Sequence, residues 1–198
     1  MFIKFQKYDD AIADFTKALE LDKKNSYAFV YLGLAKQFEK RYGEALTDYS
    51  KAIQMDRNNV EAYVRRGINH NFLKGYEKAI EDFDKAIQLD SLCTFAYFNR
   101  AFSKTSLKDV KGAIKDYDKV IDLDSENDLT YFDRADLKTK NNDIKGALDD
   151  YTKAIEINPG NVLSYFNRAL LFEKTGNYRK ALHCYSENMS RDSVNYYF

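Results

Sequence analysis

Residues 60–93 read VEAYVRRGINHNFLKGYEKAIEDFDKAIQLDSLC, and the pattern in this stretch returns along the chain. Five segments align with one another at a constant spacing of 34 residues, without insertion or deletion, and they begin at Ser26, Val60, Thr94, Asp128 and Val162. A partial copy, residues 1–25, precedes them. A fixed period of this length is typical of proteins in which each copy is one supersecondary unit that stacks on its neighbours.

Each copy contains two helical patterns. The first half has an aromatic residue followed four residues later by a small one, as in Tyr63 and Gly67. Residues four apart lie on one helical face, so the small residue would let a neighbouring helix approach beside the ring. The second half has an alanine, an aromatic residue four positions later and an alanine three further on, as in Ala79, Phe83 and Ala86. This spacing predicts an amphipathic helix. We call the two halves helix A and helix B.

Short polar side chains stand at the expected starts of the helices, where they can cap exposed backbone amides. The residues predicted to cap helix A are Asn25, Asn59, Asn127 and Asn161, and those predicted to cap helix B are Asp109 and Asp143.

The period, the two half-repeat patterns and endings such as Ala154-Ile-Glu-Ile-Asn-Pro159 resemble the tetratricopeptide repeat over nearly the whole chain. The family's usual proline is kept only at Pro159, and its leucine before the small residue only at Leu32. The resemblance implies an all-α fold, a right-handed α-solenoid of tandem 34-residue helix-turn-helix repeats whose helices A line a concave groove. We expect one solenoid over residues 1–195, with a partial repeat at 1–25, full repeats at 26–59, 60–93, 94–127, 128–161 and 162–195, and a tail at 196–198.

Composition argues against several classes of function. The chain has 31 basic and 31 acidic residues, so it lacks the positive field that attracts nucleic acid or an anionic membrane. No apolar run approaches the roughly 18 residues of a membrane span. The cysteines Cys93 and Cys184 are too far apart in sequence to suggest a metal knuckle, and we expect free thiols. These features predict a cytoplasmic protein or an intracellular fragment.

No pattern of catalytic or metal-binding residues stands out. The alternating acids from Asp122 to Asp128 look like a calcium loop, but Asn127 and Asp133 occupy the places that require glycine and a bidentate glutamate. There is no glycine-rich phosphate loop and no Gly-x-Ser-x-Gly motif. We therefore expect no enzyme activity, cofactor or metal.

The positions of helix A that face inward in the family are mostly apolar here, flanked by a few polar residues. The predicted protein-binding groove comprises Val30, Leu34, Phe38, Val64, Arg65, Ile68, Phe72, Phe98, Asn99, Phe102, Phe132, Asp133, Phe166, Asn167 and Leu170. Phe95, Leu129 and Leu163 extend the same stripe. So long an apolar track exceeds what a monomer usually exposes, although some of the rings can instead complete the packing between helices.

The sequence therefore predicts an adaptor or scaffold that captures a protein or peptide with hydrophobic anchors in this groove. The alternative is a self-associating assembly module of a larger repeat protein. Met1 falls at about the tenth place of a repeat, so the first helix A should be only a stub. The following helix B, with Ile12, Phe15 and Leu19, would lose its usual cover and allow a homodimer through the uncapped first repeat.

Charged residues recur at two fixed places in the repeat. An arginine precedes the small residue of helix A and an aspartate precedes the aromatic residue of helix B. The predicted pairs join each arginine to the aspartate of the preceding repeat: Asp48 with Arg66, Asp82 with Arg100, Asp116 with Arg134, and Asp150 with Arg168.

Overall fold

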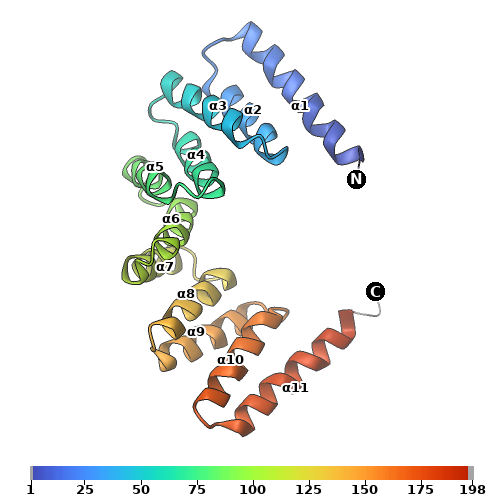
Figure 1. Cartoon of the computed structure of the whole chain (residues 1–198), viewed down its shortest axis with the longest axis vertical. Coiled ribbons are helices and arrows are strands. Elements are labelled where there is room, and N and C mark those ends of the chain that lie inside the picture. Colours follow the sequence, from blue (N-terminus) through green and yellow to red (C-terminus); the bar gives the residue numbers. More distant parts are fainter. Residues whose placement is uncertain (1, 196–198) are drawn as a thin grey trace. The chain divides into compact units, whose positions relative to one another are not determined.

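The computed structural model describes the backbone of residues 2–195 and the side chains of residues 8–187. Over this part of the chain the structure consists of 11 helices joined by short turns, without a strand (Figure 1). The chain begins with α1 (Phe2–Leu21). The helices of type A are α2 (Ser26–Phe38), α4 (Val60–Phe72), α6 (Thr94–Ser106), α8 (Asp128–Lys140) and α10 (Val162–Lys174). Those of type B are α3 (Tyr42–Met55), α5 (Tyr76–Leu89), α7 (Val110–Leu123), α9 (Ile144–Ile157) and α11 (Tyr178–Asn195).

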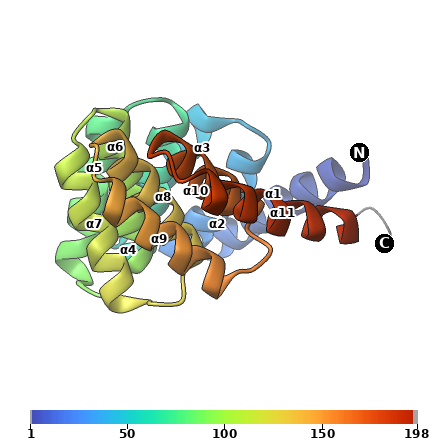
Figure 2. The same ribbon diagram turned by 90° about the horizontal axis from the view of Figure 1, so that it is seen from below.

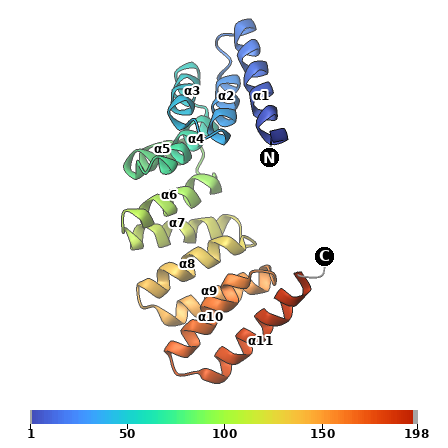
Figure 3. The ribbon, with the colours of Figure 1, turned by 45° about the vertical axis from the view of Figure 1, so that its right-hand side comes forward.

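The expected all-α fold of tandem helix-turn-helix pairs is confirmed. The division of the chain into repeats of one domain stays a prediction. Contacts group the helices into two compact units, and the chain passes from the first to the second between Asp109 and Val110. In the first unit α2 packs on α3 and α4 on α5, and in the second α8 packs on α9 and α10 on α11 (Figure 3; Figure 2 gives the view from below).

The predicted asparagine caps of helix A are confirmed. The side chain of Asn59 accepts a hydrogen bond from the Ala62 amide at 2.9 Å, and Asn25, Asn127 and Asn161 do the same for their own helices. The Asn59 amide also donates to the Ser26 hydroxyl, 33 residues earlier, at 2.8 Å. The Asn59 side chain therefore caps α4 and also forms a hydrogen bond with the preceding repeat.

Asp143 caps α9 as predicted, because its carboxylate accepts a hydrogen bond from the Gly146 amide at 3.0 Å. For α3 and α5 the residues at the same place, Arg41 and Gly75, supply no side-chain cap. Side-chain caps are thus less regular at helix B than at helix A, where four of the five helices start with a capping asparagine and α6 starts with Cys93, which supplies no cap.

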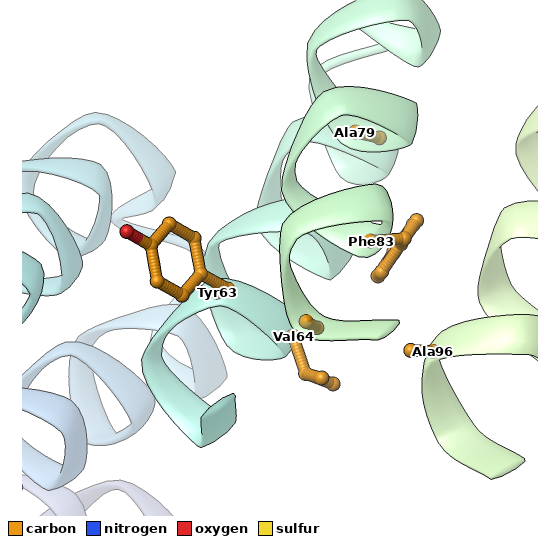
Figure 4. Packing of buried hydrophobic residues seen from close by; sticks show 6 residues of the cluster. Tyr63, Val64, Ala79, Phe83 and Ala96 are labelled. Carbon is orange, nitrogen blue, oxygen red and sulfur yellow. The ribbon is translucent and has the colours of Figure 1, made fainter. Parts of the chain in front are cut away.

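The core of the first unit is built from the small and aromatic residues of the repeat pattern. Ala79, Phe83 and Ala96 are completely buried and pack with Tyr63 and Val64 (Figure 4). A Cβ atom added to Gly67 would lie 2.7 Å from the Phe83 ring. This close approach is the reason that helix A requires a small residue there.

The first helix differs from the expectation. α1 is continuous from Phe2 to Leu21, whereas the sequence predicts a stub of helix A before a separate helix B. Residues 2–21 contain neither glycine nor proline, so no residue in this stretch interrupts the helix. Phe15 of α1 stacks on Tyr31 of α2 with ring centroids 5.7 Å apart, so α2 covers part of this helix.

The predicted charge ladder between repeats is wrong. Asp82 pairs with Arg66 of its own repeat at 2.6 Å rather than with Arg100, and Asp150 pairs with Arg134 at 2.7 Å rather than with Arg168. Asp48 pairs with Lys36 at 2.6 Å instead of Arg66. Asp116 is not the partner of Arg134, which also binds Asp118 at 2.6 Å. Asp48, Asp82 and Asp150 are buried, and each pairs with a cation on helix A of its own repeat rather than with the arginine of the next repeat.

A different set of contacts joins neighbouring repeats. Each arginine Nη1 reaches the residue 16 places earlier, on the preceding helix B. The pairs are Arg66 with Ser50 at 3.3 Å, Arg100 with Asp84 at 2.5 Å, Arg134 with Asp118 at 2.6 Å, and Arg168 with Thr152 at 3.2 Å.

Candidate functional site

In the first unit, two adjoining hollows lie along α4 and α6. One has a volume of about 620 Å³, and Val64, Arg65, Ile68 and Phe95 are among the residues that line it. The other, of about 250 Å³, is lined by Ile68, Asn71, Phe72, Phe98, Asn99 and Phe102. Ile68 and Asn99 border both hollows, which therefore form one strip. We call this strip the α4–α6 surface.

Aromatic rings dominate the α4–α6 surface. Phe72 is 56% exposed and Phe102 49%, and Phe95 is also exposed. Phe98 and Ile68 are half-buried between them. Large exposed rings beside two hollows are typical of a binding surface, because covering the rings with a partner lowers the free energy.

Polar groups on the α4–α6 surface have partners within the chain. Arg65 forms an ion pair with Glu61 one turn earlier, with Nη2 and Oε1 3.2 Å apart. The Asn99 side-chain amide donates to the Phe95 carbonyl at 2.8 Å. Because Arg65 already has a carboxylate partner, a negative ligand group would have to compete with Glu61 for it.

Asn71 lines the smaller hollow, although the repeat pattern did not predict it as a groove residue. Its Oδ1 lies 2.7 Å from the Ser103 hydroxyl of α6, while its Nδ2 is buried without a hydrogen-bond partner. The signal available in the sequence was a polar residue next to Phe72 at the end of helix A.

Two predicted groove residues do not lie on an open surface. Val30 is 0% exposed and packs in the core with Tyr49 and Ala62. Val64 is buried against Phe83, although it borders the larger hollow. Each valine lies in one core cluster with an alanine of the next helix A, Ala62 of α4 for Val30 and Ala96 of α6 for Val64.

Leu34 and Phe38 continue the apolar stripe on α2. Leu34 is half-buried. Phe38 is exposed on one side and stacks on Tyr8 of α1 on the other, with ring centroids 5.2 Å apart. Part of this predicted groove residue therefore contributes to packing between helices.

In the second unit the predicted residues lie on α8 and α10. Phe166 and Leu170 are exposed, whereas Phe132 is half-buried with its ring 5.9 Å from that of Tyr151. Asn167 donates to the Tyr151 hydroxyl at 3.4 Å. A hollow of about 250 Å³ lies here, lined by Asp136, Thr139, Tyr151, Asn167, Leu170, Leu171 and Lys174.

Asp133 is the electrostatically unusual residue of the second unit. Burial, reinforced by the negative charge of Asp136, raises the pKa of Asp133 to about 6. The Tyr117 hydroxyl donates to its Oδ2 at 3.5 Å, a long hydrogen bond that offsets little of this effect. Among the described side chains no lysine or arginine forms an ion pair with Asp133, so a cation brought by a ligand would be favoured there.

The described residues contain no group of three or more His, Cys, Asp or Glu placed to hold a metal ion. Both cysteines are free. None of the helices in the described part of the chain is both long and apolar enough to cross a bilayer.

Comparison with solved structures finds the same fold in proteins of low sequence identity. The crystal structure of MamA is 22% identical, with a TM-score of 0.80 over 84% of this chain and 98% of that one. PilF of Pseudomonas aeruginosa is 22% identical, with a TM-score of 0.82 over 92% and 83%. YrrB, described as a TPR protein with an unusual peptide-binding site, is 20% identical, with a TM-score of 0.74 over 89% and 91%. None of the curated proteins compared matches the chain.

Family models give a more specific result than these structures. Models described as tetratricopeptide repeat match residues 2–60, then 60–91, 96–127 and 130–161, and finally 150–183. Together these matches cover most of the sequence. The chain belongs to the tetratricopeptide repeat family.

Proposed function

We propose that this chain is a non-catalytic protein-interaction module whose α4–α6 surface binds a peptide or helix through hydrophobic anchors. The observation that supports this best is the pair of adjoining hollows with the rings of Phe72, Phe98 and Phe102 around the smaller one. YrrB, which shares the fold, is described as having a peptide-binding site.

The free energy of binding would come mainly from covering these rings. Burial of apolar surface contributes about 25 cal/mol per Å², and interface energy concentrates in a few central aromatic residues. The smaller hollow has room for about one large side chain, so an aromatic or leucine anchor of the partner would occupy it. In the second unit, Asp133 of α8 would favour a lysine or arginine of a ligand bound to that unit.

Substitution of the rings tests this proposal. A partner identified by pull-down and mass spectrometry would be titrated calorimetrically against Phe98→Ser and Phe102→Ser, and each is expected to weaken binding at least about tenfold. Leu21→Ser is the matched control, because Leu21 is 87% exposed on α1, outside the surface. Circular dichroism would confirm that the helices persist. Unchanged affinity in both folded variants would refute the proposal.

Self-association, the alternative from the sequence, stays a prediction, as do the single domain over residues 1–195 and the cytoplasmic location. Sedimentation velocity over a range of concentrations measures self-association directly. A chain that remains monomeric at high concentration would contradict dimerisation through the first repeat.

A further inference from the structure

The larger hollow of the α4–α6 surface is lined by two exposed aromatic rings. They belong to Tyr27 of α2 and Phe95 of α6, which are 58% and 71% exposed. Elsewhere in the chain an arginine lies over a ring of its own helix A, as Arg100 does over Tyr97, with Cζ 5.3 Å from the ring centroid. Within the described part of the chain, no cation lies over Tyr27 or Phe95, and neither ring stacks on another. Both rings are therefore open to a cation supplied by a ligand.

One negative charge in this hollow has no cationic partner. The charged residues that line it are Asp56, Glu61 and Arg65. Glu61 and Arg65 form an ion pair with each other, so their charges largely cancel. Asp56 accepts a hydrogen bond from the Asn58 backbone amide at 2.8 Å, but no lysine or arginine among the described side chains forms an ion pair with it. The hollow thus has an excess of one negative charge beside its two rings.

We infer that the larger hollow binds an arginine of the peptide whose hydrophobic anchor occupies the smaller one, an inference that rests on the function proposed above. The planar guanidinium can lie against Tyr27 or Phe95 and still donate hydrogen bonds to the Asp56 carboxylate. A lysine can pair with the carboxylate but does not stack on a ring in this way. An acidic residue would be repelled by Asp56 and would have to compete with Glu61 for Arg65.

The geometry of α6 sets the distance between the arginine and the anchor. Phe95 lines the larger hollow and Phe102 the smaller one, seven residues further along the helix. At a rise of 1.5 Å per residue, the two rings are about 10 Å apart along α6. An extended peptide covers this distance in about three residues, because each residue adds about 3.3 Å. In a helical ligand the arginine and the anchor would be about seven residues apart.

Synthetic peptides with these spacings are the probes. Two blocked extended peptides contain Arg-Gly-Ser-Phe and Phe-Ser-Gly-Arg, which cover both chain directions, and an alanine-rich helical peptide carries the pair seven residues apart. Each is titrated into the full chain by NMR, beside versions with alanine or glutamate in place of arginine. For the peptide that binds best, affinity should fall about fivefold with alanine and at least about tenfold with glutamate. Added salt should reduce both differences.

Asp56→Asn is the deciding variant of the chain. Asn158 occupies the equivalent place in a later repeat and accepts the same turn hydrogen bond, from the Gly160 amide at 3.0 Å, so the asparagine variant should fold. It is expected to bind the arginine and alanine peptides with affinities within about twofold of each other. Asp124→Asn is the matched control, because Asp124 accepts the equivalent hydrogen bond in the second unit, outside this hollow. It should keep the full preference for arginine.

The outcomes separate the arginine site from the proposed function on which it rests. Equal affinity for the arginine and alanine peptides, with binding of both lost in Phe102→Ser, would support the proposed function and overturn the arginine site. A preference for arginine that persists in Asp56→Asn, or absence of binding by every peptide at about 5 mM, would also overturn it. Arginine-dependent binding that Phe102→Ser leaves unchanged would support the arginine site and refute the anchor in the smaller hollow. Tyr27→Ser and Phe95→Ser should each reduce the preference for arginine.

Discussion

Arg168 lacks the aspartate that binds Arg66 and Arg134 through two hydrogen bonds each. Arg66 and Arg134 each bind an aspartate of their own repeat, but Cys184 stands at that place in the last repeat. Arg168 contacts Thr152 at 3.2 Å and Glu187 at 3.4 Å, and its Nε is buried without a partner. A buried donor left without an acceptor costs free energy, so this single substitution weakens the last repeat.

Cys184→Asp should restore the missing carboxylate. We expect it to raise the free energy of unfolding by about 1 kcal/mol, because hydrogen bonds to charged groups contribute that much even after desolvation. Urea denaturation followed by circular dichroism measures this. Cys184→Ser is the control, since it supplies no charge and should give no increase. A loss of stability in the aspartate variant would show that the site cannot accommodate a carboxylate.

Asp133 should make stability depend on pH. Its pKa is raised from 3.8 to about 6, so between these values the folded chain binds more protons than the unfolded one. Stability therefore falls as pH rises through this range, and the penalty persists at pH 7. Asp133→Asn should stabilise the chain at about pH 7, by on the order of 1–2 kcal/mol, and have little effect near pH 4. Urea denaturation at both values tests this, and an equal effect at both would contradict it.

At the scale of the helix, the end of helix A is more strained than its start. In each turn from a helix A to the helix B of the same repeat, one residue has a positive φ, between 59° and 75°. These residues are Lys40, Lys74, Lys108, Asn142 and Gly176. Only the last is the glycine that usually occupies this conformation. The three lysines hold it because backbone hydrogen bonds, such as that from the Lys74 amide to the Asn71 carbonyl at 2.9 Å, close the turn.

Lys74→Gly should relieve this strain. A left-handed residue other than glycine costs about 1 kcal/mol or more, part of which is offset by the greater freedom of glycine in the unfolded chain. We expect a net gain of about 0.5–1 kcal/mol, measured by thermal or urea denaturation. Lys78→Gly, inside α5, is the matched control and should lose about 1 kcal/mol. If both variants are destabilised alike, the strain at Lys74 is negligible.

At the scale of the whole molecule, helices contact mainly their neighbours along the sequence. α4 packs on α3 and α5, with smaller contacts to α2 and α6. Stability in such an array is approximately a sum of local terms, so damage in one pair is not expected to spread to distant pairs.

Phe83→Ala tests how local the stability is. Phe83 is completely buried in the first unit, and its loss should cost about 3–5 kcal/mol. Hydrogen exchange followed by mass spectrometry should show faster exchange in α4, α5 and α6, with α9 and α10 unchanged. Equal acceleration in α9 and α10 would mean that the two units unfold as one.

The amino-acid sequence by itself determined the helices, their 34-residue register, the asparagine caps and the need for a small residue at Gly67. These features follow from local periodicity and from side chains that act within a few residues, so they can be read without knowing how the helices pack. The exposed rings of Phe72 and Phe102 could be predicted for the same reason.

Only the tertiary structure decided which charges pair and which apolar residues are buried. The choice of Arg66 rather than Arg100 for Asp82, and the complete burial of Val30, depend on how one helix is rotated against the next. A rotation of a few tens of degrees moves a side chain from one neighbour to another without changing the sequence period.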